Sequence, residues 1–406
     1  MLSHLSLTNF RNYARLEMDF PSGLLLLVGG NAQGKTNLIE AVYYLSTFLS
    51  FQAENDRQLI NFTAAREPLA VARLVAEYQR GAFNHRLETR IILENENRNG
   101  TSRVRKEILL DGVKQKVAAT VGHFGAVAFL PQSIQIVEGS PEERRRFLNL
   151  AIGQVNPAYT EALTDFTRLL QQRNALLKLL AERGGDESQL DYWDAEISRW
   201  GGFLVHTRIQ ALHELEQIAA PLHRQLTRGQ EGLAFLYQPS YDPYLTISTQ
   251  YRLAVEDPID RKPIPLQQIQ EGYLNALRRQ RDEDIKRGIT TLGPHRDEIR
   301  FLSNGLDLGT YGSRGQCRTA VIAIKLAELE WVRMKSNHSP IFLLDEVLAE
   351  LDPPRRKDLL QRLLNCEQAV LTTTDLGLFE TAFTERASIW RVQNGQILAA
   401  EYDKED

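Results

Sequence analysis

A glycine-rich stretch near the start of the chain has the residue types and spacing of a phosphate-binding loop. Residues 29–36 read GGNAQGKT and fit the pattern G-x-x-x-x-G-K-[ST]. The glycines permit backbone angles that other residues resist, so the loop amides can point at phosphate oxygens. Lys35 would contact the β- and γ-phosphates of a nucleotide, and Thr36 would coordinate Mg²⁺. The predicted nucleotide-binding residues are Gly29, Gly30, Asn31, Ala32, Gln33, Gly34, Lys35, Thr36 and Asn37.

Two carboxylates at the end of an apolar segment are the expected partners of this loop. Residues 341–346 read IFLLDE, which indicates a buried strand that ends in Asp345 and Glu346. Asp345 would hold Mg²⁺, directly or through water, together with Thr36. Glu346 would orient or deprotonate the attacking water, so Glu346 and Lys35 are the predicted catalytic residues. Taken alone, the same segment fits a strand that ends in a solvated acidic turn.

A second turn with the features of an anion site lies far along the chain. Residues 311–320 read YGSRGQCRTA and lead into an apolar helical segment, VIAIKLAELEWV. The hydroxyl of Ser313, the amide of Gly315 and the N-terminus of that helix all favour an anion. A chain with a complete phosphate loop thus carries what looks like a second phosphate cradle.

Both ends of the chain have the pattern of an α/β protein, and they must position these residues. The run LLLLV before the phosphate loop predicts a buried strand, and residues 35–49 predict a helix. Residues 71–117 have a β pattern, with a hairpin signal at Asp111 and Gly112. After residue 289, strands and helices alternate as in a parallel α/β sheet.

The middle of the chain, residues 141–288, has a helical pattern. Ser140, Pro141 and Glu143 form a helix-start signal. Two long amphipathic segments joined by the residues RGGDES predict an antiparallel helical hairpin. We therefore expect an ATPase-type domain at 1–130 plus 289–406, with an inserted helical domain at 131–288.

Composition narrows the class of protein. A length of 406 residues is more than one core usually supports, and 43% apolar with 25% charged residues is ordinary for a soluble globular protein. No apolar run is long enough to cross a bilayer, and the N-terminus lacks a signal-peptide pattern, so we expect a cytoplasmic protein. The net charge of −4 argues against a generally basic nucleic-acid binder, although it leaves room for a local basic surface. Cys317 and Cys366 are too isolated for a disulfide framework or a zinc site.

The order of these motifs resembles the ABC-type ATPase head that transporters and SMC proteins share. In that family the Ser-x-Gly-Gln turn caps the γ-phosphate of the ATP bound by the opposite subunit. The resemblance therefore implies that the second cradle serves a partner's ATP. It also implies a D-loop at Asp352 and a switch role for Thr373 or Thr374, since the switch histidine of transporters is missing here. The implied trans signature consists of Ser313, Arg314, Gly315 and Gln316.

The chain resembles the bacterial RecF family more closely, from residue 7 to residue 375. The matching stretches are LTNFRNY, VEGSPEERRRFLN, LGPHRDE, SRGQCRTAVIAIKLAE and LLDEVLAELDPPRR. The implied fold is an α/β ABC-type ATPase head, with a mixed sheet and an antiparallel β part, carrying an inserted helical lobe with a short hairpin. The implied activity is weak Mg²⁺-dependent ATP hydrolysis used as a switch, with no chemistry on DNA.

The implied partners follow from the same resemblance. An ATP-dependent homodimer would bind DNA without reading its sequence, especially where single-stranded DNA meets duplex. With RecO and RecR it would promote the loading of RecA onto single-stranded gaps, in DNA repair, replication and the SOS response. The runner-up interpretation is a soluble ATPase subunit of a transporter, and a third is an ABC-type head that assembles with a nuclease. The long helical insertion and the stretch GPHRDE argue against the former, and the absence of long coiled arms against the latter.

Several roles stay open at this point. Arg314 could add charge to the trans phosphate contact or point to solvent. Asp352 could be the N-cap of a helix that begins with the residues PPRRKDLL, which is compatible with the D-loop role. Residues 9–12 could lie near the nucleotide or form an ordinary strand-ending turn. Residues 295–297, His-Arg-Asp, could face DNA or an interface, or form a salt-bridged structural turn. The basic runs at 142–146, 278–287 and 353–357 could contact DNA or be solvated helix faces, and the role of Cys317 is undefined.

Overall fold

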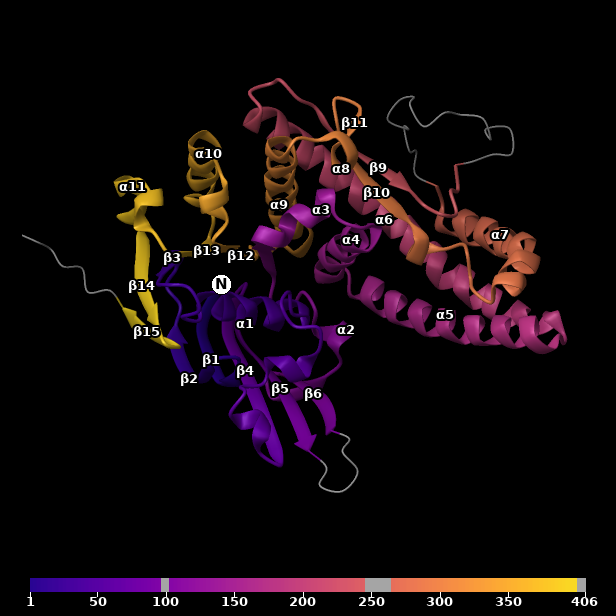
Figure 1. Cartoon of the computed structure of the whole chain (residues 1–406), viewed down its shortest axis with the longest axis horizontal. Helices are drawn as coiled ribbons and strands as arrows, with labels where there is room; N and C mark the ends of the chain where they lie inside the picture. Colours follow the sequence, from indigo (N-terminus) through magenta and orange to yellow (C-terminus); the bar gives the residue numbers. More distant parts are fainter. Residues whose placement is uncertain (96–101, 245–263, 400–406) are drawn as a thin grey trace, which may run out of the picture. The chain divides into compact units, whose positions relative to one another are not determined.

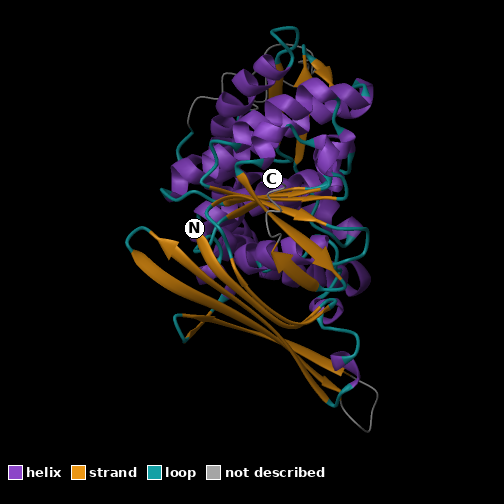
Figure 2. Cartoon of the chain, turned by 90° about the vertical axis from the view of Figure 1, so that its left-hand side faces the viewer, coloured by secondary structure: helices purple, strands orange, loops and turns teal. Residues whose placement is uncertain are grey.

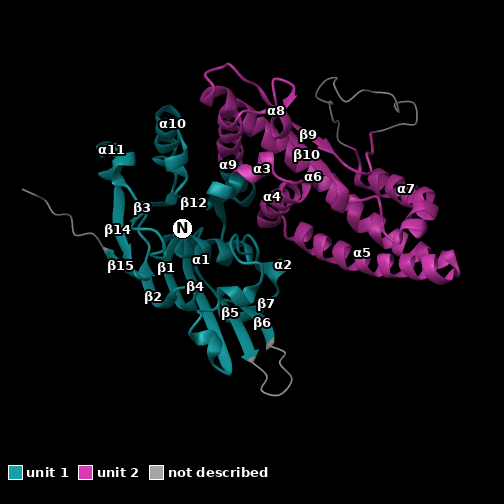
Figure 3. Cartoon of the chain, viewed as in Figure 1, with its two compact units in different colours: residues 1–133, 328–406 teal, residues 134–327 magenta. Residues whose placement is uncertain are grey.

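The computed structural model describes residues 1–95, 102–244 and 264–399, and the chain divides into two units (Figures 1 and 3). Unit 1 comprises residues 1–133 and 328–406, so it joins the two ends of the chain. Unit 2 comprises residues 134–327. The sequence predicts a polar loop between strands at the residues ENENRNGTSR, and residues 96–101 of this stretch lie outside the described residues. No helix in the described ranges is long and apolar enough to span a membrane.

A mixed six-stranded sheet in unit 1 carries the phosphate loop. Its strand order is β15-β14-β3-β13-β12-β8, and all neighbours are parallel except β15, which pairs antiparallel to β14. The central strands β3, β12 and β13 are mostly apolar and are buried along nearly their whole length, as expected for a sheet that is covered on both faces. The strands are β3 Gly23–Val28, β8 Ala126–Phe129, β12 Ile341–Asp345, β13 Gln368–Thr373, β14 Ala387–Gln393 and β15 Gln396–Ala399.

A second, antiparallel sheet of unit 1 has the order β2-β1-β4-β5-β6-β7 and forms a broad curved layer in Figure 2. The predicted hairpin at Asp111 and Gly112 is confirmed: both residues have positive φ, 51° and 80°, and they join β6 to β7. The strands are β1 Leu2–Phe10, β2 Tyr13–Asp19, β4 Leu69–Arg80, β5 Phe83–Asn95, β6 Ser102–Leu110 and β7 Val113–Gln115.

Helix α1, Lys35–Thr47, packs against strands of both sheets. Its apolar side chains, such as Leu38 and Val42, join residues of the two sheets in one buried core. The phosphate loop is therefore held between a buried strand, β3, and a buried helix. The remaining short elements of this unit are η1 Asp56–Leu59, η2 Ala64–Arg66, α2 Val117–Thr120, η7 Val347–Glu350, α10 Pro353–Leu363, η8 Leu376–Leu378 and α11 Thr381–Thr384; η3, Pro131–Ile134, crosses into unit 2.

Unit 2 is mainly helical, and its predicted hairpin is confirmed. Helices α5 and α6 pack against each other, and α7 packs against both. The predicted helix start is also confirmed, because the side chain of Ser140 accepts a hydrogen bond from the amide of Glu143. The helices are α3 Gln135–Glu138, α4 Pro141–Val155, α5 Pro157–Arg183, η4 Glu187–Gln189, α6 Leu190–Leu226, α7 Leu266–Arg287, η6 Pro294–Arg296 and α8 Leu308–Tyr311. Helix α9, Arg314–Ser336, begins in unit 2 and ends in unit 1.

The expectation of helix throughout residues 141–288 was wrong for one segment. Residues Leu233–Gln238 form strand β9, which pairs antiparallel with β10, Glu298–Ser303; β10 also pairs with β11, Leu306–Asp307. This pairing is long-range, so the local pattern did not reveal it. It also explains why residues 289–327 belong to unit 2, whereas the predicted boundary fell at 288.

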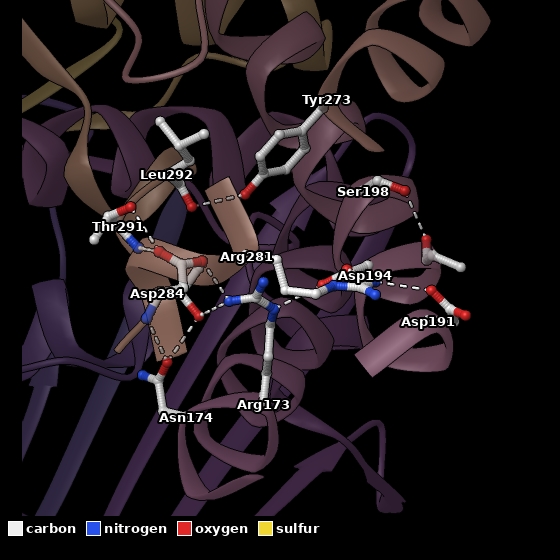
Figure 4. Close-up of polar contacts among 12 residues, drawn as sticks. Arg173, Asn174, Asp191, Asp194, Ser198, Tyr273, Arg281, Asp284, Thr291 and Leu292 are labelled. Carbon is white, nitrogen blue, oxygen red and sulfur yellow. Dashed lines mark hydrogen bonds and ion pairs between the residues drawn. The ribbon is translucent and has the colours of Figure 1, made fainter. Parts of the chain in front are cut away.

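A buried cluster of charges joins the three long helices of unit 2 (Figure 4). Arg173 of α5 donates from Nε to Oδ1 of Asp194 at 2.8 Å and from Nη1 to Oδ2 of Asp284 at 2.7 Å. All three side chains are fully buried. Arg281 of α7 donates to the second oxygen of Asp194 at 2.6 Å. Because such charges are costly to bury unpaired, the cluster fixes α5, α6 and α7 in one arrangement.

Candidate nucleotide-binding site

The two glycines of the phosphate-loop pattern are required by close backbone and side-chain approach. Gly34 has φ +116°, and a Cβ there would lie 2.7 Å from Nδ2 of Asn12. A Cβ at Gly29 would lie 2.3 Å from the carbonyl oxygen of Val392 in β14. The loop therefore fits only a sequence with glycine at both positions.

Lys35 lies at the centre of the loop, and its side chain is almost fully buried. Its Nζ donates to the carbonyl oxygens of Gly29 at 2.8 Å and Gly30 at 2.9 Å. It also pairs with Oε1 of Glu346 at 3.0 Å. The structure thus brings together two residues that are more than 300 positions apart and that the sequence predicted to act together.

Thr36 and Asp345 are also in direct contact. The hydroxyl of Thr36 donates to Oδ1 of Asp345 at 3.0 Å. Burial raises the pKa of Asp345 above its ordinary value, while hydrogen bonds from Thr372 and Thr36 oppose the shift. A hydroxyl and a buried carboxylate are oxygen ligands that Mg²⁺ prefers, and a cation would offset the cost of burying the charge. These residues fit the predicted metal site.

Thr372 is a site residue that the sequence reasoning missed. It lies beside Asp345 because β12 and β13 pair in parallel with these two residues in register. Its hydroxyl donates to Oδ1 of Asp345 at 2.6 Å and accepts from the amide of Glu346 at 3.0 Å. Of the predicted switch residues, Thr373 is bonded to the backbone of Asp375 and Thr374 is exposed. Only the strand register, which a single sequence does not give, distinguishes the three threonines.

Glu346 has an unusual backbone for its residue type. Its φ is 52° and its ψ 12°, in the left-handed region that non-glycine residues rarely adopt. Its side chain is 39% exposed, whereas the adjacent Asp345 is buried. The turn therefore directs one carboxylate into the protein and leaves the next one accessible at the loop. A partly exposed carboxylate on a strained backbone fits the role of a group that acts on water.

The N-terminal turn, residues 9–12, packs against the phosphate loop. Nδ2 of Asn12 donates to the carbonyl of Gln33 at 3.3 Å, and its Oδ1 accepts from Asn37 at 2.7 Å. Arg11 instead forms a bidentate ion pair with the buried Glu40 of α1, at 2.7 and 2.8 Å. The turn therefore braces the loop through Asn12, and the guanidinium of Arg11 is held by α1.

The end of the β14–β15 hairpin braces the same loop from another side. The side chain of Gln33 accepts a hydrogen bond from the amide of Asn394 at 2.7 Å. Its carbonyl accepts from the amide of Gly395 at 3.0 Å. The side chain of Gln33 therefore has a structural role, and the predicted nucleotide contact of this residue would come from its backbone amide.

The signature turn lies in unit 2, at the start of α9. Ser313 Oγ accepts from the amide of Gln316 at 3.3 Å, and Gln316 Oε1 accepts from the amide of Ser313 at 2.9 Å. This reciprocal pair is a capping box. The Ser313 hydroxyl keeps its own proton for a further acceptor. Arg314 is exposed, which both interpretations of its role allow. Cys317 is buried, contacts the carbonyl of Leu308 at 3.4 Å, and has a pKa raised by burial to about 11.

Asp352 caps helix α10, as one of its two interpretations predicted. Its side chain accepts from the amide of Arg355 at 3.0 Å. The D-loop role of Asp352 across a dimer stays a prediction, because the cap on α10 neither requires nor excludes it.

The structure favours a structural role for the His-Arg-Asp stretch. Asp297 is buried and accepts from Arg208 at 2.7 Å, from the hydroxyl of Tyr237 at 2.5 Å and from the amide of Ser240 at 2.9 Å. The ring of His295 is largely buried, which lowers its pKa to about 4. Arg296 is exposed. The turn is therefore held internally at Asp297 and His295, and only Arg296 offers a charge to solvent.

The basic runs are also largely engaged within the chain. Arg144 forms a bidentate ion pair with Glu298, at 2.8 and 2.9 Å. Arg281 pairs with Asp191 and Asp194. Arg356 donates to the carbonyl oxygens of Leu348 and Leu351. In each run at least one arginine therefore has a structural partner.

The fold and these sites define an ATPase head of the SMC class. Residues 1–397 match the RecF/RecN/SMC N terminal domain family. A solved Smc head bound to the C-winged helix domain of ScpA aligns with 99% of this chain and 98% of that chain, at a TM-score of 0.52 and 14% identity, which is a likeness of fold.

Within that class the chain belongs to the RecF family. It is 35% identical to the DNA replication and repair protein RecF of Roseiflexus castenholzii, over 98% of this chain and 100% of that protein. It is 36% identical to the protein of the same name in Geobacillus thermodenitrificans, over 98% and 99%. A solved structure of the recombination mediator protein RecF-ATP in the RecFOR pathway aligns at a TM-score of 0.82 and 28% identity, over 98% and 97%. The expected fold class and family are confirmed.

Proposed function

We propose that this chain is a cytoplasmic, Mg²⁺-dependent ATPase that uses ATP to close a homodimer on DNA. The observation that carries the proposal is the contact cluster at the phosphate loop, in which Lys35 pairs with Glu346 at 3.0 Å and Thr36 bonds to Asp345 at 3.0 Å. These are the four side chains that Mg²⁺-dependent phosphoryl transfer to water needs. They come from two segments far apart in sequence.

Each residue of the cluster has a defined task in this proposal. The loop amides and Lys35 bind the β- and γ-phosphates, and Thr36 with Asp345 holds the metal. The metal, when bound, neutralises charge that develops on the phosphate oxygens. Glu346 orients the attacking water and accepts its proton at a carboxylate oxygen. Thr372 holds both carboxylate-bearing residues, since it bonds to the side chain of Asp345 and to the amide of Glu346.

The second phosphate cradle gives ATP its role as a switch. Ser313, Gly315 and the N-terminus of α9 would contact the γ-phosphate of an ATP bound by the partner subunit, and Asp352 would lie at the same seam. The capping box supports this, because it orders the turn and leaves the Ser313 proton available to an anion. Hydrolysis would remove the contact and reopen the dimer.

The DNA-related part of the proposal rests on the relatives. The curated proteins that cover this chain end to end are named for DNA replication and repair, and a similar solved structure is named for the RecFOR pathway. We infer that this dimer binds junctions of single-stranded and duplex DNA without reading sequence. We also infer that it acts with RecR and RecO to promote RecA loading, and that it thereby supports the SOS response.

The test is DNA binding by the whole chain with and without ATP and Mg²⁺. A gapped duplex with a fluorescent label is titrated with wild-type protein and with Lys35→Ala at several salt concentrations. Binding that needs ATP, fails in Lys35→Ala and weakens steeply with salt supports the proposal, because neutralised phosphates release counterions. ATP-independent binding would contradict the switch, and binding that does not change with salt would contradict contact with the DNA backbone.

A further inference from the structure

Glu231 contacts the signature turn from a different part of unit 2. It lies between the end of α6 and the start of β9, and its side chain is 20% exposed. Nε2 of Gln316 donates to Oε1 of Glu231 at 3.0 Å. We propose that Glu231 is a positioning residue for the signature turn, whose carboxylate fixes the side-chain amide of Gln316 and through it the backbone of Ser313.

The two ends of the Gln316 side-chain amide differ chemically, because the NH₂ group only donates hydrogen bonds and the oxygen only accepts them. A carboxylate only accepts hydrogen bonds, so the NH₂ end of Gln316 must face Glu231. The oxygen end then faces the amide of Ser313, from which it accepts at 2.9 Å. Both contacts favour this orientation, because the reversed amide would place its NH₂ group against the N–H of Ser313 and its oxygen against the carboxylate of Glu231. Glu231 therefore strengthens the preference for the orientation that closes the capping box, and it anchors the free end of the Gln316 side chain.

Glu231 is itself held in place, as a positioning residue must be. Its Oε2 accepts from the hydroxyl of Ser303, at the end of β10, at 2.9 Å. Its amide donates to the hydroxyl of Thr227, just after α6, at 3.3 Å. His223 of α6 lies 3.9 Å from Oε2. The ends of α6 and β10 and the start of α9 thus meet at one carboxylate.

The negative charge of Glu231 argues against a role as a phosphate ligand. A carboxylate repels a phosphate, so its useful property here is its two acceptor oxygens and not its charge. A glutamine at this position has one acceptor oxygen and no charge, so it can still receive the NH₂ group of Gln316. Glu231→Gln is therefore expected to preserve the turn and to relieve the repulsion of the partner's phosphate.

The experiment measures the ATP-dependent dimer dissociation constant of the whole chain by sedimentation, so the inference rests on the proposed trans role of the signature. Glu231→Ala is expected to weaken the dimer by about tenfold or more, since a symmetric dimer loses a hydrogen bond to a charged group at two sites. Glu231→Gln is expected to dimerise at least as tightly as wild type. Ser303→Ala is the matched control: it removes a hydrogen bond to the same carboxylate but leaves Gln316 bonded, and it is expected to change the constant by less than about threefold.

Circular dichroism shows whether the helical unit 2 of each variant is folded. ATP binding below the dimerisation concentration is expected to be unchanged, because the phosphate loop lies in unit 1. If Glu231→Ala fails to fold, Glu231→Asp gives the same test, because it keeps the charge but withdraws the carboxylate from Gln316. A dimer of wild-type strength in Glu231→Ala or Glu231→Asp would overturn the inference, and so would equal weakening in Glu231→Gln. Ser313→Arg separates the two claims: if it too dimerises normally, the trans role has failed, and if it does not, only the role of Glu231 has failed.

Discussion

Nζ of Lys35 lies 3.0 Å from Oε1 of Glu346, and the same Nζ donates to the carbonyl oxygens of Gly29 and Gly30. Nζ is thus held inside the loop by the carboxylate of Glu346 and by two carbonyl oxygens. The oxygens of a bound phosphate would compete with these partners for Nζ, and the carboxylate of Glu346 would then turn toward solvent. We therefore propose that nucleotide binding and the availability of the Glu346 carboxylate are linked through this ion pair.

Replacing Glu346 tests its role on the attacking water. Glu346→Gln keeps the shape of the side chain but cannot accept a proton, so hydrolysis is expected to fall about 10²–10⁴-fold while ATP binding persists. Phosphate release measures the rate. Glu350→Gln is the matched control, since Glu350 is an exposed acid in the same turn and is expected to retain wild-type activity. Hydrolysis within twofold of wild type in Glu346→Gln would exclude this carboxylate as the base.

A comparison of neighbouring threonines tests which one supports the acidic strand end. Thr372→Val removes the hydroxyl that bonds to both Asp345 and the amide of Glu346. Loss of these two bonds is expected to cost about 1–3 kcal/mol in the site and to slow hydrolysis about tenfold or more. Thr373→Val removes two local bonds to the backbone of Asp375 and none to Asp345 or Glu346, so it is expected to have the smaller effect on the hydrolysis rate. The opposite order would show that Thr373 is the switch residue.

The buried charge cluster of unit 2 predicts a large loss of stability from a single substitution. Arg173→Met leaves the buried carboxylates of Asp194 and Asp284 short of a cation, so the free energy of unfolding of unit 2 is expected to fall by about 3–5 kcal/mol. Arg168→Met on the same helix is the control: Arg168 is exposed, and the change is expected to stay within about 0.5 kcal/mol. Urea unfolding measures both. Equal losses would mean that the cluster does not hold the helices.

Glu88 predicts a pH dependence in unit 1. Hydrogen bonds from Arg73, then from Arg90, lower the pKa of Glu88 to about 2 from an ordinary value of 4.5. A lowered pKa in the folded state adds stability above pH 4.5, and this stability is lost as the pH falls from about 4.5 to 2. Because the arginines are partly exposed, we expect about 1–2 kcal/mol. Glu88→Gln should remove this part of the pH dependence of stability. Glu94→Gln, on the same strand, is the control and should keep it. The midpoints of urea unfolding at several pH values between about 2 and 7 measure both variants.

The sequence was sufficient for the parts of the site that local patterns encode. The glycines of the loop, Lys35, Thr36, the strand end at Asp345 and the cap at Asp352 follow from motif spacing and turn chemistry, which act over a few residues. The helical hairpin followed from amphipathic periodicity in the same way.

The missed features all depend on pairing between distant segments. Strand β9 forms because β10 is available some 60 residues later, and its local pattern did not distinguish it from its helical surroundings. Thr372 lies at the site because of a parallel register that no single segment specifies. For residues 295–297 the sequence left a DNA or interface contact and a salt-bridged turn equally open, because the partners of Asp297, Arg208 and Tyr237, come from other elements.

The proposed switch requires that the turn at Ser313 contacts the ATP of a second subunit. The direct test is the molar mass of the whole chain by light scattering, without nucleotide, with ATP and Mg²⁺, and for Ser313→Arg with ATP and Mg²⁺. ATP is expected to double the mass of the wild-type protein, and Ser313→Arg is expected to stay monomeric while still binding ATP. A variant that doubles its mass like the wild type, or that loses ATP binding as a monomer, would contradict a contact in trans.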